Sequence, residues 1–246
     1  MPTLDQILER LQANLNHYDT NVPSLFCDEH VISSQVEPGH RDQNTIIDSV
    51  FRLRRKKDTD GKNVLAESRD IKKINGKPAT SQDMKGPTLL SGAFEGGLAI
   101  VSSEQTVCMN YKLQRPDKAG PYIVRFETVL TPRNSATCFL KEESKGEVFI
   151  DPASMHITHL ELTTPHHVII PGDSYTSAVV GKRVLTVDYA PVLLDGETFW
   201  MPSTISLRNT SGSGTFHMIV WSFHATYRNY HRLEVKSRIL RNGEEN

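Results

Sequence analysis

Four of the ten histidines in the chain lie in one stretch of twelve residues, HITHLELTTPHH, from His156 to His167. Imidazole is a common metal ligand and general base, so this stretch is the first candidate for a metal site or a catalytic cluster. Its pattern predicts a strand, in which successive side chains point to opposite faces. His156 and His159 then point apart and cannot bind one ion together. We expect Pro165 to end the strand and to leave His166 and His167 in a loop, where they need a distant partner.

Other signatures of catalysis are absent from the sequence. There is no Gly-x-Ser-x-Gly elbow, no glycine-rich phosphate loop and no His-Glu-x-x-His motif. A glycosidase-type pair needs two carboxyl groups about 5–9.5 Å apart in space, which the sequence cannot select. We therefore predict no catalytic residue, no metal site and no cofactor. A metal-dependent or hydrolytic enzyme that uses the His166-His167 loop stays open as an alternative.

The three cysteines, Cys27, Cys108 and Cys138, are too few for a disulfide scaffold and lack zinc-site spacing. The segment TCFLKE, which contains Cys138, has the pattern of a strand. If one further strand separates Cys138 from Cys108, the two are roughly 9–10 Å apart. A disulfide needs Cα atoms within about 7 Å. We therefore assign no bridge.

The charge of the chain argues against nucleic acid as a partner. Its 246 residues include 28 basic and 29 acidic side chains, whereas nucleic-acid binders usually carry a basic excess on one face. The basic run from Arg52 to Lys57 lies at the end of a predicted strand, so its side chains alternate between two faces. No stretch approaches the roughly 18 apolar residues of a transmembrane span, and we expect none.

The N-terminal segment is predicted to be a helix over residues 1–18. Thr3 and Gln6 have the spacing of a capping box. A single apolar stripe at helical spacing follows, formed by Leu4, Ile7, Leu8, Leu11, Leu15 and Tyr18. Such a stripe has to pack against another part of the protein.

Most of the remaining chain has the pattern of antiparallel strands. We expect the first strands over residues 24–78, a helical lid segment over 86–103 and the remaining strands over 107–241. Short turns such as Asn75-Gly76 and Asp60-Gly61 join successive strands, which predicts a meander. The βαβ rhythm of Rossmann and TIM-barrel folds is missing. The chain is thus predicted to form one domain, 1–246, of the α+β class with about a dozen strands.

The order of the hairpins resembles one known family. The relevant stretches are GEVFIDPASMHITHLEL, LDGETFWMPSTISL, DIKKINGKP and the closing YRNYHRLEVKSRI. With the leading helix, this order is similar to the LolA/LolB-like superfamily of bacterial envelope proteins, and in particular to its uncharacterised secreted members. The resemblance implies a curved, unclosed half-barrel with helices over its concave face. It also implies an extracytoplasmic location after removal of a signal peptide, and carriage of lipids or lipoprotein acyl chains in the cavity.

The physical pattern is compatible with an apolar ligand site between the helices and the sheet. Its predicted lining residues are Phe94, Leu98, Phe126, Leu160, Trp200 and Trp221. We expect a non-enzymatic binding or carrier protein for a lipid or acyl chain. The alternative is a β-rich envelope scaffold with a filled core, whose partner would be an envelope protein.

Overall fold

The computed structural model describes residues 2–36, 43–57, 59, 61, 63–84, 98–114, 120–169, 177–213 and 216–233. Their strands form one antiparallel sheet. From one edge to the other its strands are β4 (Lys77–Pro78), β3 (Asn63–Ile74), β2 (Gln43–Lys57), β1 (Leu25–Gln35), β11 (Phe216–Arg232), β10 (Glu197–Ser213), β9 (Ser177–Leu194), β8 (Ile157–Ile169), β7 (Lys145–Ile150), β6 (Tyr122–Thr128) and β5 (Met109–Gln114).

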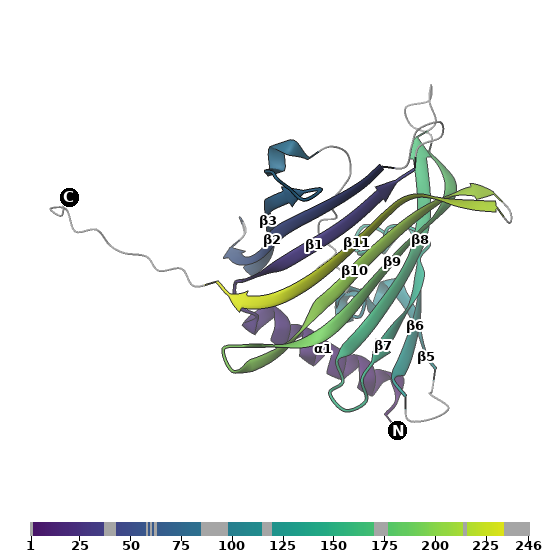
Figure 1. Cartoon of the computed structure of the whole chain (residues 1–246). Coiled ribbons are helices and arrows are strands. Elements are labelled where there is room, and N and C mark those ends of the chain that lie inside the picture. The colour runs from purple at the N-terminus through teal and green to yellow at the C-terminus, as the bar shows by residue number, and fades with distance from the viewer. Residues whose placement is uncertain are drawn as a thin grey trace.

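The sheet is a meander whose two halves meet where β1 pairs with β11. Its outer strands β4 and β5 do not pair with each other, so the sheet does not close. It bends into an open half-barrel, and the helix α1 (Leu4–Asn21) lies along the hollow side (Figure 1). The predicted half-barrel with an N-terminal helix is confirmed. In the described residues no helix is long and apolar enough to cross a membrane.

A row of small and medium apolar side chains crosses the concave face in register. It consists of Val31, Ala225, Ile205, Val187, Leu160, Val148 and Val124, contributed by seven neighbouring strands. Each of them is at most 1% exposed. The alternation seen in the sequence therefore turns one face of every strand toward a common core.

Helix α1 begins with the predicted capping box, in which Thr3 and Gln6 exchange backbone and side-chain hydrogen bonds. Its stripe packs inward, with Ile7, Leu11 and Tyr18 buried. The guanidinium of Arg55 on β2 donates to the carbonyl oxygens of Asp19 and Val22, at 2.5 and 2.8 Å. These bonds satisfy backbone acceptors at the end of the helix and fix it to the sheet.

Two tight turns have the geometry that their residues predict. Asn75 and Gly76 have φ values of 50° and 77°, and Asp195 and Gly196 have 53° and 82°. Two successive positive φ values define the type I′ turn that suits a two-residue hairpin. The β3–β4 and β9–β10 hairpins are therefore fixed locally.

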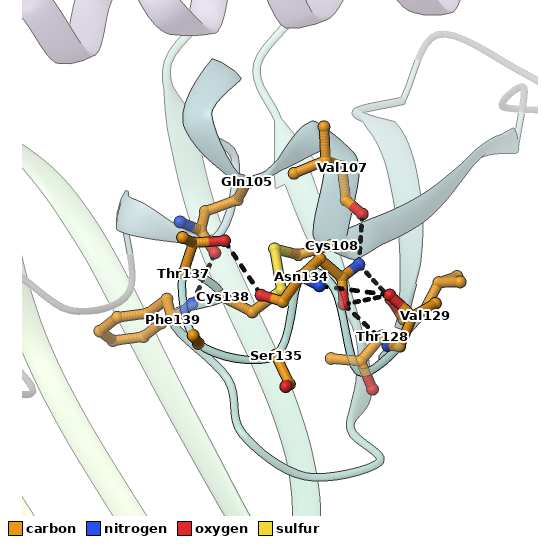
Figure 2. Close-up of a disulfide and its surroundings, with 12 residues drawn as sticks. Gln105, Val107, Cys108, Thr128, Val129, Asn134, Ser135, Thr137, Cys138 and Phe139 are labelled. Carbon is orange, nitrogen blue, oxygen red and sulfur yellow. Dashed lines mark hydrogen bonds between the residues drawn. A yellow bond between two sulfur atoms is a disulfide. The ribbon is translucent and has the colours of Figure 1, made fainter.

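The prediction that TCFLKE is a strand is wrong, and the structure contains a disulfide that the sequence left unassigned. Residues 129–144 form a loop of turns between β6 and β7, and this loop returns Cys138 to Cys108, the residue before β5. The two cysteines form a disulfide with a Cα–Cα distance of 5.6 Å (Figure 2). Asn134 closes the loop: its amide donates to the carbonyl oxygens of Val107 and Val129 at 2.8 and 2.9 Å.

The prediction that Pro165 ends its strand is also wrong, since β8 continues to Ile169. The last residue of β8 that pairs with β7 is Thr163. Beyond it β8 pairs with β9 alone, and Pro165 lies opposite Lys182. Proline is tolerated where a strand has a neighbour on only one side, because its missing N–H is then not needed on the other. His166 and His167 are consequently strand residues.

The described part of the lid segment begins at Leu98, since residues 85–97 lie outside the described residues. A helical turn there precedes a short 3-10 helix, η2 (Ser103–Cys108). The backbone N–H of Ser103 donates to the side-chain carbonyl of Gln12 on α1 at 2.6 Å. The hydroxyl of Tyr111 on β5 donates to the carbonyl of Ile100, also at 2.6 Å. This end of the segment is thus anchored to both α1 and the sheet.

Candidate functional site

A cavity of about 40 Å³ lies between α1, the end of the β9–β10 hairpin and the described part of the lid segment. Most of its lining is apolar and includes Leu11, Leu15, Leu98, Val101, Phe199 and Trp200. One water molecule needs roughly 10–15 Å³ of such space, whereas ligand pockets usually measure about 300–1,000 Å³. In this conformation the cavity is large enough for small molecules such as water, and a lipid chain requires α1 or the lid segment to move.

Two histidines that line the cavity stack on aromatic side chains of β10. His156 lies against Trp200 with ring centroids 5.4 Å apart, and His17 of α1 lies against Phe199 at 5.8 Å. His17 also pairs with Glu197, with Nε2 and Oε1 2.9 Å apart. Burial lowers the pKa of His156, and the nearby His17 lowers it further. His156 is therefore an uncharged imidazole at neutral pH.

Tyr189, one of the lining residues, carries an isolated polar group. The residue is 6% exposed, and its hydroxyl has no hydrogen-bond partner among the described residues. Burial raises the pKa of this phenol well above its usual value, so it stays protonated. A buried polar group without a partner costs about 1–3 kcal/mol. A molecule whose oxygen forms a hydrogen bond with this hydroxyl would remove part of that cost.

A second polar group, the Glu29 cluster, lies on the concave face around β1 to β3. The Glu29 carboxylate accepts bonds from Arg69 Nε at 2.8 and 2.9 Å, from Ser49 at 2.6 Å and from Tyr227 at 3.0 Å. Its side chain is completely buried and that of Arg69 is 9% exposed. The Arg69 guanidinium also lies over the ring of Phe51, 4.9 Å from its centroid. Both carboxylate oxygens accept hydrogen bonds, so the cluster links the strands that carry these side chains.

Cys27 lies near this cluster and is not a reactive thiol. Its side chain is buried, and burial together with the charge of Glu29 raises its pKa to about 12. Since the thiolate is the nucleophile, a cysteine in this environment is inert.

The structure brings only some of the predicted lining residues together. Leu98 and Trp200 line the cavity under α1. Leu160 is fully buried in the central core row, and Phe126 is 3% exposed within the same core. Trp221 is half-buried on β11, where its indole donates to the hydroxyl of Ser33 at 3.0 Å. Phe94 lies outside the described residues.

Phe126 packs directly on the backbone of β7 at Gly146. A Cβ at Gly146 would lie 2.5 Å from the Phe126 ring and 1.9 Å from the carbonyl oxygen of Glu161. We expect Gly146→Ala to lower the free energy of unfolding by about 1–3 kcal/mol through overpacking, as measured by urea denaturation. Ser154→Ala, at an exposed turn position, is the control. A Gly146→Ala protein as stable as this control would contradict the close packing.

The histidines of the stretch that suggested a metal site each contact a different partner. His159 Nδ1 lies 2.6 Å from Asp188 on the outer face, and His166 Nδ1 lies 2.9 Å from the carbonyl of Thr210. His167 pairs with Glu142, with Nε2 and Oε1 3.3 Å apart. His156 and His159 diverge as predicted. Within the described part of the chain, no three histidine, cysteine or acidic side chains are grouped to hold a metal ion.

One pair on the outer face has the chemistry of a nucleophile and its base. Ser206 Oγ lies 2.7 Å from His224 Nδ1, and Asp188 is close enough to interact electrostatically with His224. Acyl transfer also needs N–H donors aimed at the oxyanion. Here β10 is paired on both sides, so its backbone N–H groups are used in the sheet. This pair therefore lies on the outer face of the sheet without backbone donors from β10 beside it.

Sequence reasoning missed the residues that give the concave face its polar groups. Glu29 occupies an inward position in the alternation of Leu25, Cys27 and Val31, which was a usable signal for a buried partner. Tyr189 likewise follows Val187 at an inward position. Which side chains surround Glu29 and Tyr189 depends on strands that are far apart in the sequence.

Comparison with known proteins adds similarity in structure alone. No family model matches the chain, and no curated protein matches it. A LolA superfamily protein from Nitrosomonas europaea is 10% identical, with a TM-score of 0.37 over 93% of this chain and 94% of that chain. A putative outer membrane lipoprotein-sorting protein domain from Vibrio parahaemolyticus is 14% identical, with a TM-score of 0.36 over 91% and 90%. A DUF1329 family protein from Desulfovibrio piger is 8% identical, with a TM-score of 0.41 over 94% of each chain. The fold itself is established by the sheet order and register.

Proposed function

We propose that the protein is a non-enzymatic carrier or sensor of an apolar ligand, such as a lipid or acyl chain, outside the cytoplasm. The observation that carries this proposal is the apolar cavity between α1 and the concave face, whose lining includes Tyr189, a residue with a buried hydroxyl that has no partner among the described residues. An apolar site with few, specifically placed polar groups is the usual form of a small-molecule site.

Entry of a chain-like ligand requires the cavity to widen, and α1 is the element best suited to move. Near the cavity three side chains of α1 make polar contacts with other described elements: Asn14 donates to the carbonyl of Met155 at 2.7 Å, Gln12 accepts from Ser103, and His17 pairs with Glu197. Ile7, Leu11 and Tyr18 add apolar packing. A ligand chain can replace such packing with equivalent contacts, because apolar burial is not directional.

The disulfide supports a location outside the cytoplasm. Structural disulfides form and persist in oxidising compartments and are rare in the cytosol, where thiols are kept reduced. The bridge links Cys108 at the end of η2 to Cys138 in the loop between β6 and β7. The proposed location is therefore the periplasm or the secreted fraction.

The proposal is tested by native mass spectrometry and by binding of a fluorescent ester, methyl 12-(1-pyrenyl)dodecanoate. We expect protein purified without detergent to retain a lipid, and the wild type to bind the ester. Leu15→Trp fills the cavity and should weaken ester binding about tenfold, equivalent to roughly 1.4 kcal/mol. Ile32→Trp, at a position 42% exposed on the outer face, is the matched control and should bind normally. A wild type without retained lipid and without ester binding would refute the proposal.

A scaffold or interaction module is the second candidate, and one surface favours it. Three apolar side chains around the disulfide are exposed: Val107 at 66%, Phe139 at 47% and Val129 at 46% (Figure 2). Exposed apolar clusters often mark contacts with other proteins. If the protein is a scaffold, the wild type should not bind the ester, and the cavity between α1 and the concave face should not widen.

A further inference from the structure

The Tyr189 hydroxyl restricts which apolar ligands the cavity can accept, and this inference rests on the proposed function. We propose that the ligand is an uncharged amphiphile, an alcohol, ester or ketone, whose oxygen forms a hydrogen bond with Tyr189. Free carboxylates and phosphates of the same chain length are excluded.

The first argument is the state of the Tyr189 hydroxyl. A phenol has one donor hydrogen and accepting lone pairs, and in the described structure neither is used. The side chain is 6% exposed, so bulk water does not reach it freely. A ligand oxygen placed here exchanges an unsatisfied buried group for a hydrogen-bonded one, which an alkane cannot do.

The second argument is the charge of the lining. Among the described residues around this cavity there is no lysine or arginine. His17 and His156 are the basic side chains in this described part of the lining. His17 already pairs with Glu197, and the stack of His156 on Trp200 is in a half-buried environment that favours neutral imidazole. An anion would lose its hydration without gaining a counter-charge, which is costly in an apolar site.

A bound water molecule is the competing explanation for Tyr189. The cavity has room for water, and a water oxygen would satisfy the phenol equally well. The two cases differ in selectivity. If a water molecule forms the hydrogen bond with Tyr189 in every complex, removing the hydroxyl changes the affinities for an alcohol and for an alkane by the same factor.

The test measures how octane, 1-octanol and octanoate displace the pyrenyl ester at pH 8, where most exposed imidazoles are neutral. In the wild type, octanoate should bind at least about tenfold more weakly than 1-octanol. Tyr189→Phe should lower the affinity ratio of 1-octanol to octane by roughly 2- to 12-fold, the range of one net hydrogen bond. Tyr122→Phe, a partly buried phenol on β6 away from the cavity, should leave the ratio unchanged.

The outcomes separate this inference from the proposed function. If none of the three compounds and no ester binds to the wild type, both fail. If octane and 1-octanol bind but Tyr189→Phe leaves their ratio unchanged, the Tyr189 inference fails and the carrier function stands. If octanoate binds as tightly as 1-octanol, the restriction to uncharged ligands fails. Tyr189→Phe should fold normally, because the hydroxyl that it removes has no partner among the described residues, and circular dichroism checks this.

Discussion

Arg69→Ala is expected to lower the free energy of unfolding by about 3–5 kcal/mol, because it leaves the Glu29 carboxylate buried without its cationic partner. Arg69 Nε contacts both oxygens of Glu29, and the Glu29 side chain has no exposed surface. Loss of the guanidinium also removes its contact with the ring of Phe51. Urea denaturation followed by circular dichroism measures the change.

Arg125→Ala is the matched control for this prediction. Arg125 also pairs with a glutamate on the neighbouring strand, with Nε 2.7 Å from Glu147 Oε1. Its side chain is 59% exposed, so water replaces the lost partner and the expected cost is below about 1 kcal/mol. Equal losses for Arg69→Ala and Arg125→Ala would show that the Glu29 cluster is not desolvated.

A double variant distinguishes the charge from the packing. Replacing a buried pair by apolar residues of similar volume is often neutral or stabilising, whereas removing one partner is not. The Glu29→Leu, Arg69→Met protein should therefore be more stable than Arg69→Ala. If it is less stable, the cluster contributes to the fold through the hydrogen bonds of Ser49 and Tyr227 as well as through the ion pair.

Removing the disulfide with Cys108→Ala, Cys138→Ala is expected to cost about 3–4 kcal/mol. The two cysteines are separated by 30 residues, and the bridge restricts that length of chain in the unfolded state. For a protein of this size the loss corresponds to a melting temperature lower by roughly 6–16 °C. Thermal denaturation with and without dithiothreitol measures it, and the reduced wild type should melt like the variant.

Cys27→Ala provides the control, because Cys27 is buried and forms no bridge. This variant should still lose stability when dithiothreitol is added, whereas the double variant should not respond. A wild type whose melting temperature is the same under reducing conditions would contradict the prediction. Hydrogen exchange then shows where the loss acts: amides of residues 98–108, which the bridge fixes to the β6–β7 loop, should lose protection first.

The sequence by itself determined the elements whose signals are local. The capping box and apolar stripe predicted α1, and Thr3 and Gln6 adopt that geometry. Asparagine or aspartate followed by glycine predicted the two-residue turns, since these residues adopt positive φ at little cost. Alternation then predicted antiparallel strands with one buried face, and short connections predicted that most consecutive strands pair, but not that β1 pairs with β11.

Only the tertiary structure decided features that depend on residues far apart in the chain. Pro165 stays in a strand because β7 ends beside it, and Cys138 reaches Cys108 because Asn134 folds the intervening loop. The cavity lining joins α1 to residues of β9 and β10 more than 170 positions away. Strand patterns indicate which face is buried but not which side chains meet there. The environment of Tyr189 follows from sheet curvature and helix docking, which no local signal encodes.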